Sequence, residues 1–174
     1  IKYTFQDIRF LQNQDVKMIV IACNTASACS LELVKHSFDF PIVEVVGPGA
    51  AAAAKATMNN RVGVIGTPAT IASGVYEKAI LRINSKIDIF SKPCPMFVPL
   101  VEEGWWENDI AFRIAEEYLN PLKELEIDTL VLGCTHYPLL QNTIQKVMGD
   151  GVKLVNSALE VAKVVKEAID ANNS

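Results

Sequence analysis

Short apolar runs alternate with amphipathic stretches along the whole chain. The three clearest runs are residues 18–21, 61–65 and 129–132, each almost continuously built from Val, Ile, Leu or Met. Such runs are typical of parallel strands covered by helices on both faces, because a half-exposed strand alternates apolar with polar side chains. Weaker strand candidates are residues 42–46, 87–90 and 153–155.

Helical periodicity fills most of the segments between these runs. We expect helices in the first dozen residues and at approximately 26–36, 49–57, 74–82, 107–119, 138–148 and 157–171. The alanine run at 50–54 favours a helix because alanine has no side-chain rotamer entropy to lose. Strands that alternate with helices in this way predict an α/β fold with mostly parallel sheets flanked by helices.

One nine-residue pattern occurs twice. Residues 17–25 and 128–136 each begin with a charged residue and continue through an apolar run to a small residue, a cysteine and two polar residues. We interpret the repeat as two pseudo-symmetric lobes: residues 1–46 plus 152–174, an incomplete first lobe carrying Cys23, and residues 47–151, a second lobe carrying Cys134. Ligands bind outside the carboxyl ends of parallel strands, so an active-site cleft is expected between the lobes.

Composition excludes several other classes of protein. Of 174 residues, 50% are hydrophobic and 21% are charged, which is enough apolar material for a buried core. The net charge of −4 and the lack of a basic stripe argue against nucleic-acid binding. The apolar runs are too short to cross a bilayer, so we expect no membrane insertion.

The four cysteines contain no Cys-x-x-Cys pair, and the chain has only two histidines. We therefore expect no metal site, and we expect reduced thiols in a cytoplasmic protein rather than a disulfide framework. The chain begins at Ile1, inside a predicted helix, and we expect it to be an internal piece of a longer chain.

Cys23 and Cys134 are the strongest candidates for chemistry. Each is expected where a strand ends and a helix begins, and a helix amino terminus lowers the pKa of a thiol. A single cysteine after a strand is usually a buried apolar filler. Here, however, both are followed by polar pairs, Asn24-Thr25 and Thr135-His136, and this repetition favours a binding or catalytic site.

Two further side chains have competing interpretations. His136 either exchanges a proton with Cys134 or caps the helix expected near Pro138. Glu102 follows an apolar segment and is either a buried carboxylate with a shifted pKa or a solvated group at a helix start. The Gly66-Thr67 turn lacks the full glycine-rich pattern and the lysine of nucleotide-binding loops, so we expect no nucleotide cofactor.

Five segments resemble the bacterial glutamate racemase family, in the same order along nearly the whole chain. They are Ile21-Ala-Cys-Asn-Thr-Ala-Ser-Ala, Val46-Gly-Pro-Gly-Ala, Val62-Gly-Val-Ile-Gly-Thr, Val98-Pro-Leu-Val-Glu-Glu-Gly and Leu132-Gly-Cys-Thr-His-Tyr-Pro-Leu-Leu. The Cys-Thr-His-Tyr-Pro motif is the most specific, because its histidine distinguishes this family from the related aspartate racemases. The family's Asp-Ser-Gly-x-Gly-Gly motif and its Tyr-Gly pair do not occur in these residues, and Asn156 stands where the family often has Asp.

The resemblance implies cofactor-independent racemisation of L-glutamate to D-glutamate for peptidoglycan synthesis, with a homodimer as the active form. One cysteine thiolate would remove the α-proton and the other cysteine would return a proton to the opposite face, so that Cys23 and Cys134 are the two bases. The implied substrate-binding residues are Asn24, Thr25, Thr135 and His136. His136 would also assist Cys134, and Glu102 is a possible accessory.

Three alternatives remain open from the sequence. The substrate can be aspartate or a related amino acid instead of glutamate. The protein can also be a hydrolase or thiol transferase with Cys134 as nucleophile and His136 as base, although this leaves the Cys23 motif unexplained. Finally, it can be a non-catalytic binding or interaction module whose cysteines are structural.

Overall fold

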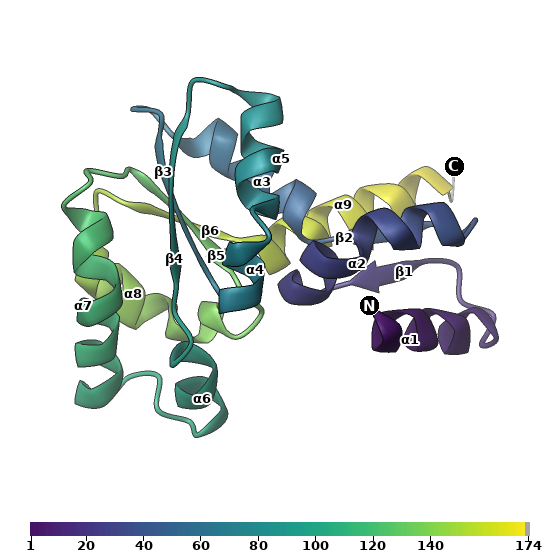
Figure 1. The fold of residues 1–174 in the computed structure, drawn as a ribbon, viewed down its shortest axis with the longest axis horizontal. Coiled ribbons are helices and arrows are strands. Elements are labelled where there is room, and N and C mark those ends of the chain that lie inside the picture. The colour runs from purple at the N-terminus through teal and green to yellow at the C-terminus, as the bar shows by residue number, and fades with distance from the viewer. Residues whose placement is uncertain (173–174) are drawn as a thin grey trace.

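The computed structural model describes residues 1–172 and contains two parallel β-sheets (Figure 1). The larger sheet has the strand order β4-β3-β5-β6 and the smaller one pairs β1 with β2. All pairings are parallel, which confirms the predicted α/β fold. The strands are β1 (Ile19–Ile21), β2 (Ile42–Glu44), β3 (Arg61–Gly66), β4 (Asp88–Pro93), β5 (Thr129–Gly133) and β6 (Lys153–Asn156).

Every helix expected from the sequence is present. The helices are α1 (Lys2–Gln12), α2 (Asn24–Ser37), α3 (Val46–Ala56), α4 (Pro68–Ala72), α5 (Val75–Ile83), α6 (Phe97–Glu102), α7 (Asp109–Lys123), a 3₁₀ turn η1 (Tyr137–Leu140), α8 (Gln141–Met148) and α9 (Ser157–Asn172). Sequence reasoning missed α4 and α6, because helices this short show too few turns for their periodicity to be read.

Helices cover both faces of the larger sheet. Leu130 and Leu132 of β5 pack into one apolar cluster with residues of α6, α7 and α8, while Val131 packs into a second cluster with residues of α3 and α5. Every residue of β5 is buried. Burial on both faces explains why the strand reads as one continuous apolar run.

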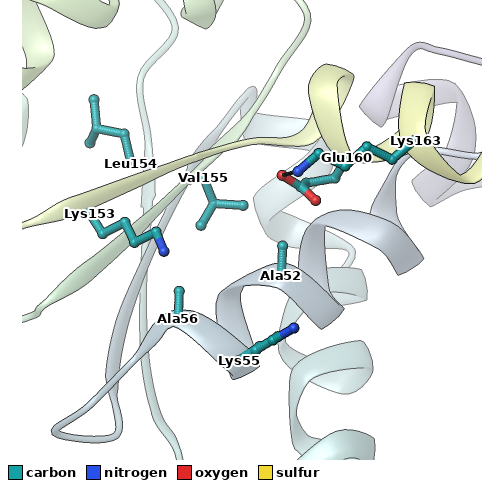
Figure 2. A pocket seen from close by; sticks show the side chains of 8 residues that line it. All are labelled: Ala52, Lys55, Ala56, Lys153, Leu154, Val155, Glu160 and Lys163. Carbon is teal, nitrogen blue, oxygen red and sulfur yellow. Dashed lines mark hydrogen bonds and ion pairs between the residues drawn. The ribbon is translucent and has the colours of Figure 1, made fainter.

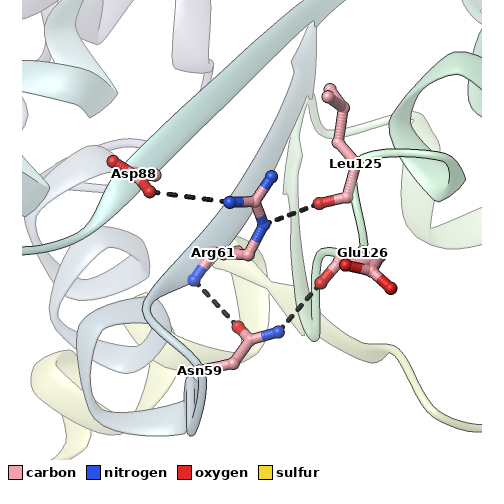
Figure 3. A network of polar contacts seen from close by, with 5 residues as sticks. All are labelled: Asn59, Arg61, Asp88, Leu125 and Glu126. Atoms are coloured by element: carbon pink, nitrogen blue, oxygen red, sulfur yellow. Dashed lines mark hydrogen bonds and ion pairs between the residues drawn. The ribbon is translucent and has the colours of Figure 1, made fainter.

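The end of this sheet remote from the cysteines is held by polar contacts around Arg61, the first residue of β3 (Figure 3). The Arg61 side chain donates to the Leu125 carbonyl at 2.7 Å and lies 3.7 Å from the Asp88 carboxylate. Asn59 accepts from the Arg61 amide at 2.9 Å and donates to the Glu126 carbonyl at 2.8 Å. The loops that enter β3 and β5 are thereby tied to each other.

The smaller sheet has a thinner core. Its fully buried apolar cluster consists of Ile8, Ile19, Ile21 and Val34, contributed by α1, β1 and α2. Figure 1 shows α1, α2 and α9 around this two-stranded sheet, on the opposite side of the molecule from α7 and α8. No helix among residues 1–172 is long and apolar enough to cross a membrane.

One predicted boundary needs correction. Residues 152–174 were all assigned to the first lobe, but β6 pairs with β5 and so belongs to the larger sheet. The chain returns to the smaller lobe only with α9, which packs against both α3 and β2. The apolar pattern of a short strand identifies the strand but not the sheet it joins, which depends on tertiary pairing. The remainder of the two-lobe division stays a prediction.

Candidate active site

Cys23 and Cys134 lie at equivalent places in the two sheets. Cys23 follows β1 by two residues and is the N-cap of α2, where its sulfur accepts from the Ala26 amide at 3.5 Å. Cys134 directly follows β5, and the η1 turn and α8 come after it. Both cysteines therefore stand at carboxyl ends of parallel strands, where α/β proteins bind ligands.

The two thiols have different surroundings. Cys23 is exposed, whereas Cys134 is 7% exposed. Burial raises the pKa of Cys134, and the charge of Cys23 raises it further. Hydrogen bonds from the His136 and Tyr137 amides and from the Thr135 hydroxyl act in the opposite direction.

His136 links Cys134 to Glu102. Its Nδ1 atom is 3.9 Å from the Cys134 sulfur and its Nε2 atom is 3.3 Å from a Glu102 carboxylate oxygen. His136 occupies the N-cap position of η1, but its side chain makes no capping hydrogen bond. The interpretation as a helix cap therefore fails, and the ring instead lies between a thiol and a carboxylate.

Glu102 is solvated, as one of its two sequence interpretations had it, but it does not stand at a helix start. It is the last residue of α6 rather than a helix start, and its side chain is 64% exposed rather than buried. The preceding segment turned out to be a short helix whose apolar residues Phe97, Leu100 and Val101 enter the core. This helix directs its end towards His136, which is why Glu102 reaches the site despite its exposure.

The residues after Cys23 contact the larger lobe through side chains. Asn24 is 2% exposed, and its Oδ1 atom accepts from the Tyr76 hydroxyl at 2.6 Å. Its Nδ2 atom is buried with no hydrogen-bond partner among the described residues. A buried unpaired donor is uncommon, and a ligand acceptor or a water molecule can satisfy it.

Thr25 belongs to a cluster of three hydroxyls. Its Oγ1 atom is 2.8 Å from that of Thr67 and 3.0 Å from that of Thr70, and the latter two are 3.0 Å apart. Thr67 follows β3 and is the N-cap of α4. Sequence reasoning considered Thr67 only as part of a nucleotide loop and missed Thr70 and Tyr76, whose contacts depend on how the lobes pack.

Of two cavities in the structure, one adjoins Cys23 and the other lies apart from the cysteines. One of about 190 Å³ lies between α1 and β1 and has Cys23 in its wall. Another, of about 330 Å³, is lined by α3, β6 and α9, including Lys55, Lys153 and Lys163 (Figure 2). None of the cysteine-site residues lines the second cavity. Within residues 1–172, no cluster of three or more His, Cys, Asp or Glu side chains is arranged to hold a metal ion.

The fold and the site together define a class: an α/β protein with two parallel sheets, one cysteine at a strand end of each, and polar side chains beside both cysteines. The chain belongs to the Asp/Glu/Hydantoin racemase family, whose model matches residues 2–165.

Individual relatives agree with this assignment. A glutamate racemase of Geobacter metallireducens is 50% identical over 168 residues, which cover 97% of this chain and 62% of that protein. The crystal structure of the RacE1 isoform of glutamate racemase from Bacillus anthracis superimposes with a TM-score of 0.94 at 36% identity, over 98% of this chain and 64% of the other. Glutamate racemase from Francisella tularensis in complex with D-glutamate gives 0.91 at 37% identity, over 99% and 64%. The chain thus spans somewhat less than two thirds of the relatives that it matches.

Proposed function

We propose that the protein racemises glutamate without a cofactor, interconverting the L and D enantiomers and supplying D-glutamate for peptidoglycan. The observation that carries the proposal is the pair of cysteines at carboxyl ends of parallel strands, one in each sheet, each followed by ligand-binding side-chain types. The Geobacter relative, 50% identical, is a glutamate racemase, and the Francisella structure holds D-glutamate. Both support glutamate as the substrate.

The reaction needs a base on one face of the α-carbon and an acid on the other. In one direction, one cysteine thiolate takes the α-proton, and the electron pair of the C–H bond is delocalised into the adjacent carboxylate. The opposite cysteine then gives its thiol proton to the other face and becomes the new thiolate. Protons and charge balance without any oxidant or cofactor, and the reverse direction exchanges the roles of Cys23 and Cys134.

The remaining predicted site residues bind substrate and adjust the bases. The Asn24 Nδ2 donor, Thr25, Thr135 and His136 bind the polar groups of glutamate. His136 also supports the Cys134 thiolate from a contact distance of 3.9 Å, and Glu102 orients the imidazole through its other nitrogen. Cys134 needs this assistance because burial raises its pKa.

We also propose that the active form is a cytoplasmic homodimer. The cytoplasm keeps thiols reduced, as a two-cysteine mechanism requires. Trp105 and Trp106 are 45% and 37% exposed, and such exposed aromatic surface supports association. Analytical ultracentrifugation of the natural protein should give twice the monomer mass, and a monomer that is fully active would contradict this part.

Proton exchange in D₂O tests the proposal directly. The natural protein that contains these residues is incubated with L-glutamate, and α-deuteration and D-glutamate are measured by mass spectrometry and chiral chromatography. We expect both products with glutamate and far less of either with aspartate. Absence of α-deuteration would favour the hydrolase or binding-module alternatives, and faster reaction with aspartate would favour a different racemase.

A further inference from the structure

Tyr76 of α5 lies between the two cysteine-bearing strand ends. It is 2% exposed, and its hydroxyl donates to Asn24, the residue after Cys23. Its ring lies against Gly133, the residue before Cys134, since a Cβ built on Gly133 would be 3.2 Å from the Tyr76 Cε2 atom. One side chain therefore contacts the neighbours of both proposed bases.

Two glycines make the space that the Tyr76 ring occupies. A Cβ on Gly133 would approach the Ile65 carbonyl oxygen to 2.6 Å as well as the ring. A Cβ on Gly49 of α3 would lie 3.2 Å from the Tyr76 hydroxyl oxygen and 3.2 Å from the Ser157 Cβ. The ring is thus enclosed by backbone on both sides and has little freedom to move.

Tyr76 also lies where the chain passes between the lobes. Gly49 is in the first turn of α3, and Ser157 is the first residue of α9. The Ser157 hydroxyl donates to the Leu132 carbonyl of β5 at 3.1 Å, which ties the start of α9 to the strand that carries Cys134. The surroundings of Tyr76 therefore include both connections between the lobes.

The hydrogen bond to Asn24 determines which end of the amide is available. Because the Tyr76 hydroxyl donates to Oδ1, the Nδ2 group remains as a donor, and it is the buried atom without a partner. Burial raises the pKa of Tyr76, so the phenol keeps its proton and stays a donor. In a reversed amide the Nδ2 group would donate to the Tyr76 hydroxyl oxygen and Oδ1 would be the atom without a partner, so the observed orientation is the one that leaves a donor for substrate.

We propose that Tyr76 is a positioning residue for glutamate racemisation: its hydroxyl fixes the Asn24 amide as a donor to substrate, and its ring holds the two cysteine strand ends at their working separation. This inference rests on the proposed function. Proton transfer between sulfur and carbon is sensitive to small displacements, so a spacer between the two bases matters even though it touches neither.

The Tyr76→Phe variant removes the hydroxyl and keeps the ring, so it separates the two roles. We expect KM for glutamate to rise about tenfold, the usual effect of losing one buried hydrogen bond, with kcat nearly unchanged. Tyr76→Leu removes the ring as well and should lower kcat in addition. The matched control is Tyr118→Phe, a change of the same kind in α7. The Tyr118 hydroxyl accepts from the Met96 amide, outside the proposed site, so both constants should stay unchanged.

A double-mutant cycle with Asn24→Ala distinguishes positioning from general stability. If Tyr76 acts through Asn24, Tyr76→Phe has no further effect on KM once the amide is gone, whereas independent effects multiply. Multiplying effects, or a Tyr76→Phe variant with unchanged KM, would overturn the inference while leaving the racemase proposal intact. An unsubstituted protein that racemises no glutamate would overturn both.

A second variant covers the case in which Tyr76→Phe fails to fold. Gly49→Ala places a methyl group 3.2 Å from the Tyr76 hydroxyl and so displaces it from Asn24 without removing it. We expect a rise in KM similar to that of Tyr76→Phe, with circular dichroism confirming the fold. A folded Gly49→Ala protein with the KM of the unsubstituted enzyme would contradict the inference.

Discussion

The two lobes present the same short motif in very different settings. Cys134 ends a strand in which every residue is buried, within a four-stranded sheet covered on both faces. Cys23 follows a three-residue strand of a two-stranded sheet and is itself exposed. The repeated motif therefore specifies where a thiol stands, whereas its surroundings determine how deeply that thiol is buried.

The difference suggests that the two proposed bases reach their working state by different routes. Cys23 is open to water and stands at the amino end of the 14-residue helix α2. Cys134 is buried, which raises its pKa, and it has amide donors together with His136 at 3.9 Å to oppose that effect. A racemase that works in both directions needs the two routes to give comparable basicity.

The largest expected effect is on the cysteines themselves. Cys23→Ser and Cys134→Ser should each lower racemisation by roughly a thousandfold or more, because a hydroxyl ionises far less readily than a thiol at neutral pH. Each variant should lose α-proton exchange with a different enantiomer, because the bases face opposite sides of the substrate. Deuterium uptake from D₂O by L- and D-glutamate, measured separately, distinguishes them.

Cys29→Ser is the matched control, since Cys29 is an exposed cysteine of α2 outside the site, and it should keep full activity. Near-normal racemisation by either site variant would show that one thiol is sufficient. The different surroundings of the two cysteines would then have no consequence for the reaction.

A second prediction compares the packing of the lobes. Ile65 in β3 and Ile21 in β1 are 0% and 6% exposed. We expect Ile65→Ala to lower the free energy of unfolding by about 4 kcal/mol and Ile21→Ala by about 2 kcal/mol, because a thin core relaxes around a cavity more easily. Urea unfolding measures both values, and equal losses would show that the smaller lobe is packed as rigidly as the larger one.

The third prediction concerns how kcat of a His136 variant depends on pH. The raised pKa of Cys134 means that its thiolate is scarce at low pH and increases as the pH rises. His136→Asn removes the imidazole beside the thiol, so we expect kcat in the direction that uses Cys134 as base to fall by about 10–100-fold. The rising limb of that pH profile should move to higher pH, while exchange that depends on Cys23 as base should keep its profile. Equal shifts in both directions would contradict a role confined to Cys134.

The sequence predicted the larger lobe well because its strands are continuous apolar runs and its longer helices are strongly periodic. The same reasoning placed Cys23 and Cys134 at strand ends, as the structure has them, since a motif repeated at two strand ends can be recognised without knowing how the two sheets pack. It failed for β6, where the strand was recognised but not the sheet that it joins.

The contacts between the lobes could not be predicted. Asn24 meets Tyr76 across 52 positions, and Thr25 meets Thr70 across 45, with no pattern in the sequence that links them. The sequence also left open whether Glu102 is buried or solvated and placed it at a helix start rather than at the end of α6, because α6 is too short for its buried face to be recognised in advance. Side chains that act through tertiary packing are therefore the part of this site that only the structure reveals.

The smallest expected effect on kcat is that of substituting Glu102. It tests the difference between the surroundings of Cys134 and Cys23 in the most detail. Its carboxylate lies 3.3 Å from His136 but is 64% exposed, so solvent and salt screen the contact. We expect Glu102→Gln to lower kcat by only about threefold at low salt, because an exposed ion pair contributes little, and to have a smaller effect at high salt. Glu103→Gln, at the exposed neighbouring position, is the control. The test is to measure steady-state rates in both directions at two ionic strengths. A salt-sensitive loss of rate, limited to the direction that uses Cys134 as base, supports the carboxylate–imidazole–thiol chain. A loss as large as that of His136→Asn would instead mean that Glu102 contacts the substrate or itself moves a proton.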